Sequence, residues 1–273
     1  MVTEFTRTLI YCIVLLGLMT IVLGCTLAVS ATETPMPPTA TATPTNEALV
    51  ETWQTIMPGL EMRIYVPEGN VIGQLLVLRI DPALYTFRVH YHPGEPLNTS
   101  GWRNELPDAA AFVNTNFFDR QYYILGLLVA DSVVYGTSYT DRGGTFAIQD
   151  GQPSLTSNIE TPYQGEVFEQ AVQAFPMLVF ENAQAYTTTR GDRPTRRTVI
   201  AQDAQGRILL IATPLLGQRL ADLAAYLLTT DMEIVSALNL DGGRSTMMVV
   251  QADTPYAVNS FDLVPAVLAV YAR

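Results

Sequence analysis

The first 50 residues are not expected to join a folded core. Residues 9–29 form an almost unbroken apolar run, preceded by Arg7 and the amino terminus, which is typical of an export signal or a membrane anchor. The residues that follow are rich in Thr, Pro and Ala, and such a composition buries too little apolar surface to fold. We therefore expect a signal or anchor over residues 1–25, a linker over 26–50 and a folded domain over 51–273.

The end of the apolar run predicts how the chain is anchored. It reads Val22-Leu23-Gly24-Cys25, which is similar to the bacterial lipoprotein signal, in which the cysteine is lipidated and becomes the new N-terminus. We predict lipidation at Cys25. An uncleaved transmembrane helix with an incidental cysteine is the alternative, because about 20 apolar residues are enough to span a bilayer. Both interpretations place the folded domain outside the cytoplasm, anchored to a membrane.

Composition excludes several classes of protein. The formal net charge is −11, from 15 basic and 26 acidic residues, so a protein that follows nucleic-acid phosphates electrostatically is disfavoured. The cysteines are Cys12 and Cys25, both in the apolar run, which excludes a disulfide scaffold, a zinc ribbon and a cysteine nucleophile in the domain. His90 and His92 are the only histidines, so a multi-histidine metal site is excluded as well. We expect no cofactor, and calcium held by oxygen ligands stays open.

The hydrophobic pattern of the domain predicts short strands with a few helices. Residues 84–91 alternate between apolar and polar side chains, as in a half-buried strand, which makes His90 an exposed strand residue rather than a ligand. Apolar residues recur at helical spacing over 218–228, so an amphipathic helix is expected there. Further strands are expected over 71–80, 234–240, 246–251 and 264–271, with a hairpin over 199–211. The fold class we predict is a single strand-rich α+β domain.

The segment from Ala237 to Thr246 carries the strongest chemical signal. An apolar strand runs directly into Asp241, and Gly242 and Gly243 then permit positive φ and a close approach of another group to the backbone. A carboxylate fixed at a strand end beside free backbone amides suits catalysis. The alternative is a hairpin in which Asp-Gly makes the turn.

Two other segments bring together polar groups that suit a glycan. Asn116, Phe118 and Asp119 follow an apolar run, and they can bind a sugar by stacking and hydrogen bonds. Alternatively Phe117 and Phe118 are core residues, while Asn116 and Asp119 cap a turn. The second segment, residues 190–198, holds four arginines in an acidic chain, and guanidinium groups bind phosphate or carboxylate in bidentate fashion. The alternative there is a solvated loop that balances nearby acids.

These segments, in this order, resemble the phosphodiester glycosidase family. The motifs that carry the resemblance are Asn114 to Phe118, Gly126 to Val129, Phe175 to Val179, Arg196 to Thr198, and Asn239 to Thr246. The resemblance covers roughly residues 74–271. The sequence departs from the family pattern at Thr115 and Arg244, where glycine is usual, and at Arg196, where proline is usual. These departures bear on the substrate more than on the fold.

The resemblance implies a hydrolase that cleaves the C1–O bond of a sugar 1-phosphodiester. Such cleavage passes through an oxocarbenium-like transition state and needs a carboxylate near the anomeric carbon. Asp241 is then the nucleophile or general base, Asp119 the second carboxylate, and Arg197 the phosphate ligand. The remaining residues expected to bind substrate are Asn116, Phe118, Thr198, Asn239, Gly242, Gly243, Ser245 and Thr246.

Two other functions compete with this one. A non-catalytic wall or exopolysaccharide module could bind a phosphorylated glycan with the same residues. A metal-dependent phosphodiesterase would break the P–O bond instead, but the chain lacks histidine clusters and a dense run of Asp and Asn ligands.

Overall fold

The computed structural model describes residues 52–68, 70–180, 184–189, 191–252 and 255–273. The chain divides into two units, residues 1–42 and 43–273, and all described residues belong to the second. The expected signal, Cys25 and the whole expected linker lie outside the described residues. No helix within the described part of the chain is long and apolar enough to cross a membrane.

Three antiparallel sheets and two short α-helices make up the described domain. The first sheet has the order β1-β2-β3-β14-β13-β15-β11-β12, with β1 Gln54–Met57, β2 Leu60–Tyr65, β3 Leu75–Ile80, β14 Ile208–Ala212, β13 Thr198–Asp203, β15 Ile234–Asn239, β11 Met177–Phe180 and β12 Gln184–Ala185. The second has the order β7-β6-β10-β8-β9, with β7 Val133–Gly136, β6 Leu127–Ala130, β10 Gln170–Ala174, β8 Gly144–Gln149 and β9 Gln152–Ser157. The third has the order β17-β16-β5-β18-β4, with β17 Tyr256–Val258, β16 Met248–Val250, β5 Ala111–Asn114, β18 Ala266–Ala272 and β4 Tyr85–Tyr91. The helices are α3 Thr99–Glu105 and α4 Leu220–Leu227, and the 3-10 turns are η1 Val71–Gly73 and η2 Gly243–Ser245.

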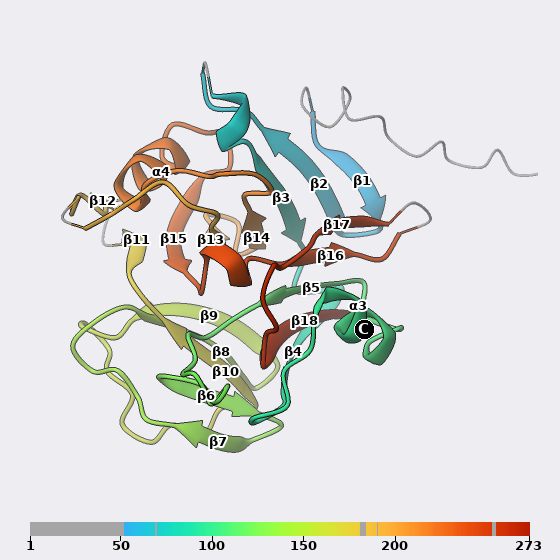
Figure 1. The fold of residues 1–273 in the computed structure, drawn as a ribbon, viewed down its shortest axis with the longest axis vertical. Helices are drawn as coiled ribbons and strands as arrows, with labels where there is room; N and C mark the ends of the chain where they lie inside the picture. Colours follow the sequence, from blue (N-terminus) through green and yellow to red (C-terminus); the bar gives the residue numbers. More distant parts are fainter. Residues whose placement is uncertain (1–51, 69, 181–183, 190, 253–254) are drawn as a thin grey trace, which may run out of the picture. The chain divides into compact units, whose positions relative to one another are not determined.

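One core joins the three sheets, and each helix covers the outer face of one of them. Leu78, Phe146 and Leu268, one from each sheet, are buried in the shared core. Figure 1 shows α4 beside the first sheet and α3 beside the third. Leu223 of α4 packs against buried residues of the first sheet, and Trp102 of α3 packs against the third. Because strands such as β18 are buried on both faces, they are continuous apolar runs rather than alternating ones.

Most predicted elements are present, with three differences. Among the described residues only two α-helices occur, so the strand-rich part of the predicted class is confirmed and the architecture is mostly β. The predicted strand over 71–80 starts as the 3-10 turn η1, whose first turn is capped by Asn70. The hairpin alternative at Asp241 is wrong: β15 lies in the first sheet and β16 in the third, so the Asp-Gly segment connects two sheets.

Candidate active site

The ends of three strands meet at one buried asparagine. Asn114 ends β5, and its side chain accepts hydrogen bonds from Thr198 Oγ1 (2.7 Å) and the Met247 N–H (2.9 Å). Its Nδ2 donates to the carbonyl of Asp241 (2.7 Å), and the Asp241 N–H donates back to the Thr115 carbonyl (2.8 Å). This network ties β5, β13 and the segment after β15 together, so the polar ends of distant strands share one site.

Asp241 lies in this site without a cationic partner. Its carboxylate accepts hydrogen bonds from the Gly242 N–H (2.9 Å) and from Ser245. In the described part of the chain, no arginine or histidine pairs with it. Burial raises the pKa of Asp241 to about 6, although the two hydrogen bonds act in the opposite direction. A carboxylate whose pKa lies near neutrality can act as a nucleophile, a general base or a general acid.

Several buried oxygens on the two segments that meet at Asp241, residues 114–116 and 239–246, have no hydrogen-bond partner in the protein. They are Thr115 Oγ1, Asn116 Oδ1, Asn239 Oδ1 and Thr246 Oγ1. The amide nitrogens are occupied: that of Asn116 donates to the Leu125 and Leu127 carbonyls, and that of Asn239 to the Phe175 carbonyl. The amides are therefore held in place with their oxygens free. Because buried polar atoms are nearly always satisfied, free oxygens gathered near a carboxylate indicate a site for the hydroxyl groups of a ligand.

The two glycines after Asp241 allow a close backbone contact and a positive φ. A Cβ on Gly242 would lie 2.8 Å from the Arg196 carbonyl, and Gly243 has a φ of +62°. We predicted from the sequence that these glycines bind substrate. Their N–H groups have partners within the protein: Gly242 donates to Asp241 and Gly243 to the Arg196 carbonyl (2.7 Å). The glycines thus let the Asp241 segment lie directly against the start of β13.

The second predicted carboxylate, Asp119, lies in a loop at the edge of the site. Its Oδ1 accepts the N–H groups of Gln121 (2.9 Å) and Tyr123 (3.0 Å), so it caps a turn. The ring of Phe118 stacks on Tyr122, with 5.7 Å between their centroids. A pocket of about 370 Å³ opens here, lined by Phe118, Asp119, Arg120, Tyr122 and Asp262. The charge of Asp262, which lines this pocket, also raises the pKa of Asp241, after the larger effect of burial.

Arg197 and Thr198 are held by internal hydrogen bonds. The guanidinium of Arg197 pairs with the buried carboxylate of Asp192 (2.9 Å) and donates to the carbonyls of Arg193 (2.8 Å) and Gln218 (3.1 Å). Burial lowers the pKa of Arg197, against the opposing effect of Asp192. The hydroxyl of Thr198 is bound by Asn114. Sequence analysis singled out both residues but could not indicate that their polar groups face partners inside the protein.

Sequence reasoning missed Asn114 as the residue that organises the site. The signal was present in the sequence Asn114-Thr115-Asn116 at the end of an apolar strand. Residues two apart in a strand share a face, so two asparagines at this spacing indicate a polar face at the strand end. Among the described residues, no group of three or more His, Cys, Asp and Glu side chains is placed to hold a metal ion.

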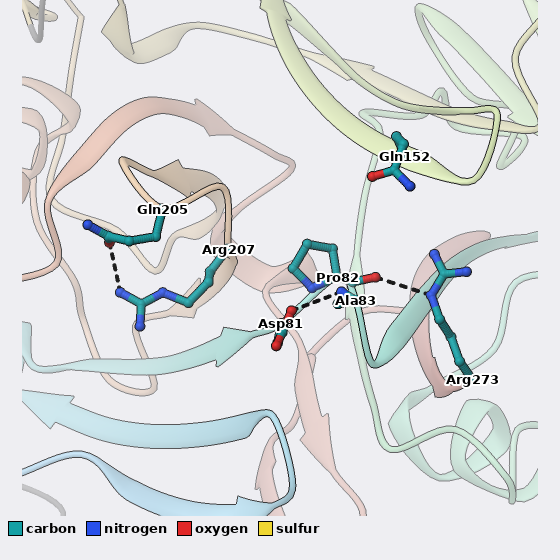
Figure 2. Close-up of a pocket in the computed structure, with 7 residues that line it drawn as sticks. All are labelled: Asp81, Pro82, Ala83, Gln152, Gln205, Arg207 and Arg273. Atoms are coloured by element: carbon teal, nitrogen blue, oxygen red, sulfur yellow. Dashed lines mark hydrogen bonds between the residues drawn. The ribbon is translucent and has the colours of Figure 1, made fainter.

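A second and larger hollow, of about 460 Å³, lies at the other end of β13 (Figure 2). Its lining includes Asp81, Gln152, Arg207 and Arg273. Figure 2 shows Arg273 bound to the Pro82 carbonyl, and Arg207 bound to Gln205. Its polar groups are largely engaged with each other, and it lies away from the Asp241 segment.

Comparisons with known proteins show the family and the fold. A sequence model of the phosphodiester glycosidase family matches residues 107–271, so the chain belongs to that family. Among curated proteins, none matches the chain. One similar solved structure is the zebrafish N-acetylglucosamine-1-phosphodiester alpha-N-acetylglucosaminidase catalytic domain, auto-inhibited by its pro-peptide, with a TM-score of 0.59 and 17% identity over 81% of this chain and 86% of that one. Another is a hypothetical protein from Synechocystis, with a TM-score of 0.55 and 16% identity over 83% of this chain and 65% of that one. At these identities the structures establish the shared fold.

Proposed function

We propose that the chain is an extracytoplasmic hydrolase that cleaves the C1–O bond of a sugar 1-phosphodiester in a cell-surface or extracellular glycan, anchored through a lipid at Cys25. Membership of the phosphodiester glycosidase family supports the reaction class. The name of the zebrafish neighbour supports N-acetylglucosamine 1-phosphodiesters as the first substrates to test. The apolar run before Cys25 supports the location.

The observation that carries the proposal is the state of Asp241. It is partly buried, has no cation partner among the described residues, and lies where two segments with unpartnered amide and hydroxyl oxygens meet. In the proposed reaction Asp241 attacks the anomeric carbon, or activates water to do so, while positive charge develops on the sugar ring. Asn116, Asn239 and Thr246 hold sugar hydroxyls through their free oxygens, and Ser245 orients the carboxylate. Because the departing phosphate monoester is a weak base, it leaves with little need for a proton, and hydrogen-bond donors stabilise its charge instead.

Asp119 is the second carboxylate in this proposal. It lines the pocket next to Asp241, and in the proposed reaction it acts on the water or the leaving group. Phe118 in the same pocket offers a ring on which a sugar can stack. The proposed hydrolysis needs no group-carrying cofactor, because the diester and water supply every atom that changes bonds, and calcium held by oxygen ligands stays open.

The competing proposal is a glycan-binding module, and product formation separates the two. The full chain, purified in a mild detergent, is incubated with a panel of sugar 1-phosphodiesters, and free sugar and phosphate monoester are measured by mass spectrometry. Release of both in equal amounts, and loss of release in Asp241→Asn, supports the hydrolase. Measurable binding without product across the panel supports the binding module and contradicts our proposal.

A further inference from the structure

Three arginines near the site differ in what their guanidinium groups touch. Arg197 already has a counter-charge: its Nη2 binds Asp192 and the Arg193 carbonyl, and its Nε binds the Gln218 carbonyl. The side chains of the Arg197–Asp192 pair are only 10% and 4% exposed. Moving this arginine to a ligand would leave a buried carboxylate unpaired. A cation without a counter-charge is therefore better suited to the phosphate of the proposed substrate.

Arg196 is a buried cation without a counter-charge. It is 6% exposed, and among the residues that the structure describes it has no carboxylate at ion-pair distance. Its Nη2 donates to the carbonyls of Thr246 (3.0 Å) and Asn259 (2.9 Å), while Nε and Nη1 have no acceptor. A buried charge left unpaired is costly, so its presence indicates that an anion supplies the missing charge when bound.

Arg244 is the accessible cation beside it. Its Nε donates to both carboxylate oxygens of Asp262 (2.8 and 3.0 Å), and the two side chains are 68% and 44% exposed. Exposed ion pairs contribute little to stability, so a phosphate can take the place of Asp262 on this arginine. The two arginines share one aromatic neighbour, since the guanidinium carbons of Arg196 and Arg244 lie 4.5 and 5.9 Å from the centre of the Phe261 ring.

Arg244 lies close in the sequence to Asp241 and contacts the segment that holds Asp262. It lies in η2, three residues after Asp241, and its carbonyl accepts the N–H groups of Phe261 (2.7 Å) and Asp262 (3.2 Å). Asp262 in turn lines the pocket that holds Arg120, for which the described residues provide no ion-pair partner. A phosphate that takes the place of Asp262 on Arg244 would thus lie next to a residue that lines a pocket of about 370 Å³.

We propose that Arg244 binds the phosphate of the substrate directly, displacing Asp262, with Arg196 supplying the uncompensated positive charge behind it. This inference rests on the proposed function for the identity of the ligand. It assigns the alcohol side of the diester to the pocket of Phe118 and Arg120, and it assigns Arg197 to positioning β13 rather than to binding phosphate.

Binding of inorganic phosphate to the full chain tests the inference without requiring turnover. Phosphorus NMR titrations give the dissociation constant for the unmodified protein, Arg244→Gln, Asp262→Asn and Arg88→Gln. Arg88 is the matched control, because it also forms an exposed bidentate pair, with Asp131, and does not line the pocket. We expect Arg244→Gln to weaken phosphate binding by about tenfold, Arg88→Gln to leave it unchanged, and Asp262→Asn to tighten it.

The opposite directions expected for Arg244→Gln and Asp262→Asn separate a ligand site from a structural ion pair. Equal dissociation constants for Arg244→Gln and Arg88→Gln, or weaker binding in Asp262→Asn, would overturn the inference, as would absence of phosphate binding to the unmodified protein. Arg196→Met, checked first for an unchanged melting temperature, should also weaken binding; if it does not fold, the other variants decide. Arg244-dependent phosphate binding in a protein that hydrolyses no sugar 1-phosphodiester would leave this inference standing and defeat the proposed function instead.

Discussion

Two aspartates at opposite ends of the first sheet have opposite surroundings. Asp203 ends β13, its side chain is 0% exposed, and it accepts hydrogen bonds from Arg207 Nε (2.6 Å) and from the N–H groups of Gln205 (3.0 Å) and Arg207 (2.8 Å). Asp241 follows β15, is partly buried, and has two hydrogen bonds but, among the described residues, no cation partner. Arg207 lines the hollow of Figure 2, where most polar groups are paired. A carboxylate removed from solvent is thus structural where a cation neutralises its charge, and it is available for chemistry where no cation does so.

The largest effect expected from this comparison is on turnover. Asp241→Asn should reduce kcat on a sugar 1-phosphodiester by about 10³-fold, because the amide can neither attack carbon nor accept a proton. Its melting temperature at neutral pH should not fall, since the cost of burying a charge disappears. Steady-state kinetics and calorimetry measure the two quantities. Loss of folding together with loss of activity would instead make Asp241 a structural residue.

The next largest effect is on stability, at the other aspartate. Asp203→Ala should destabilise the domain by about 3 kcal/mol, because it removes three hydrogen bonds to a charged acceptor and leaves Arg207 without its partner. Activity at a temperature where the variant is folded should be unchanged. Urea unfolding followed by circular dichroism gives the free energy. A loss below about 0.5 kcal/mol would remove the distinction between the two aspartates.

The pH dependence of stability sharpens the comparison further. The pKa of Asp241 is raised in the folded state to about 6, from an ordinary value of 3.8. Its favourable contribution is therefore fully present below the unfolded pKa and is lost as pH rises through about 6. Asp241→Asn should match the unmodified protein below pH ~4 and exceed its stability above pH ~6, by up to about 3 kcal/mol. Unfolding free energies at a series of pH values measure this gap, and a gap that grows toward low pH would contradict the raised pKa.

The same carboxylate should control the rate. If Asp241 reacts in its ionised form, kcat/KM rises with pH, changes about tenfold per unit below pH ~6 and becomes level above it. Rates measured with the unmodified protein between pH 4.5 and pH 8, roughly, define the curve around that pKa. A rate that falls as pH rises through 6 would identify Asp241 as a general acid and exclude the nucleophile role.

Two threonines provide the smallest and most closely matched test. Thr198 and Thr246 are both fully buried, but the hydroxyl of Thr198 donates to Asn114 whereas that of Thr246 has no partner. Thr198→Val should cost about 1–3 kcal/mol by leaving the Asn114 oxygen short of a donor. Thr246→Val should leave stability within about 0.5 kcal/mol and raise KM instead. If both variants lose stability equally, the free oxygens of the site are not reserved for a ligand.

The sequence predicted much of the fold because its signals were local. The alternation in β4 and the turn at Asp203 to Gly206 are set by nearest neighbours, and both are confirmed. The start of η1 was mistaken for a strand, because Val71 and Ile72 are β-branched and apolar although both are exposed. The Asp-Gly segment was ambiguous, because only the pairing of β15 and β16 with different sheets distinguishes a connection from a hairpin.

The site was harder to predict, since its side chains are defined by distant partners. Asp241 and Asn239 stand out in the sequence. Asn114 does not, because its place in the site depends on a hydrogen bond from Thr198, at the start of β13, which is 84 residues further along the chain. Likewise, four arginines in one short segment look equivalent. Only the folded structure separates Arg197, which pairs with Asp192, from Arg196, which is buried without a counter-charge among the described residues.

The position of the bond that breaks tests the account most directly. The full chain is incubated with a sugar 1-phosphodiester in water enriched in oxygen-18, and the products are analysed by mass spectrometry. Attack at the anomeric carbon, as proposed for Asp241, places the label in the released sugar and none in the phosphate monoester. Label in the phosphate would mean P–O cleavage, and it would contradict the assignment of Asp241 as the residue that acts on the sugar.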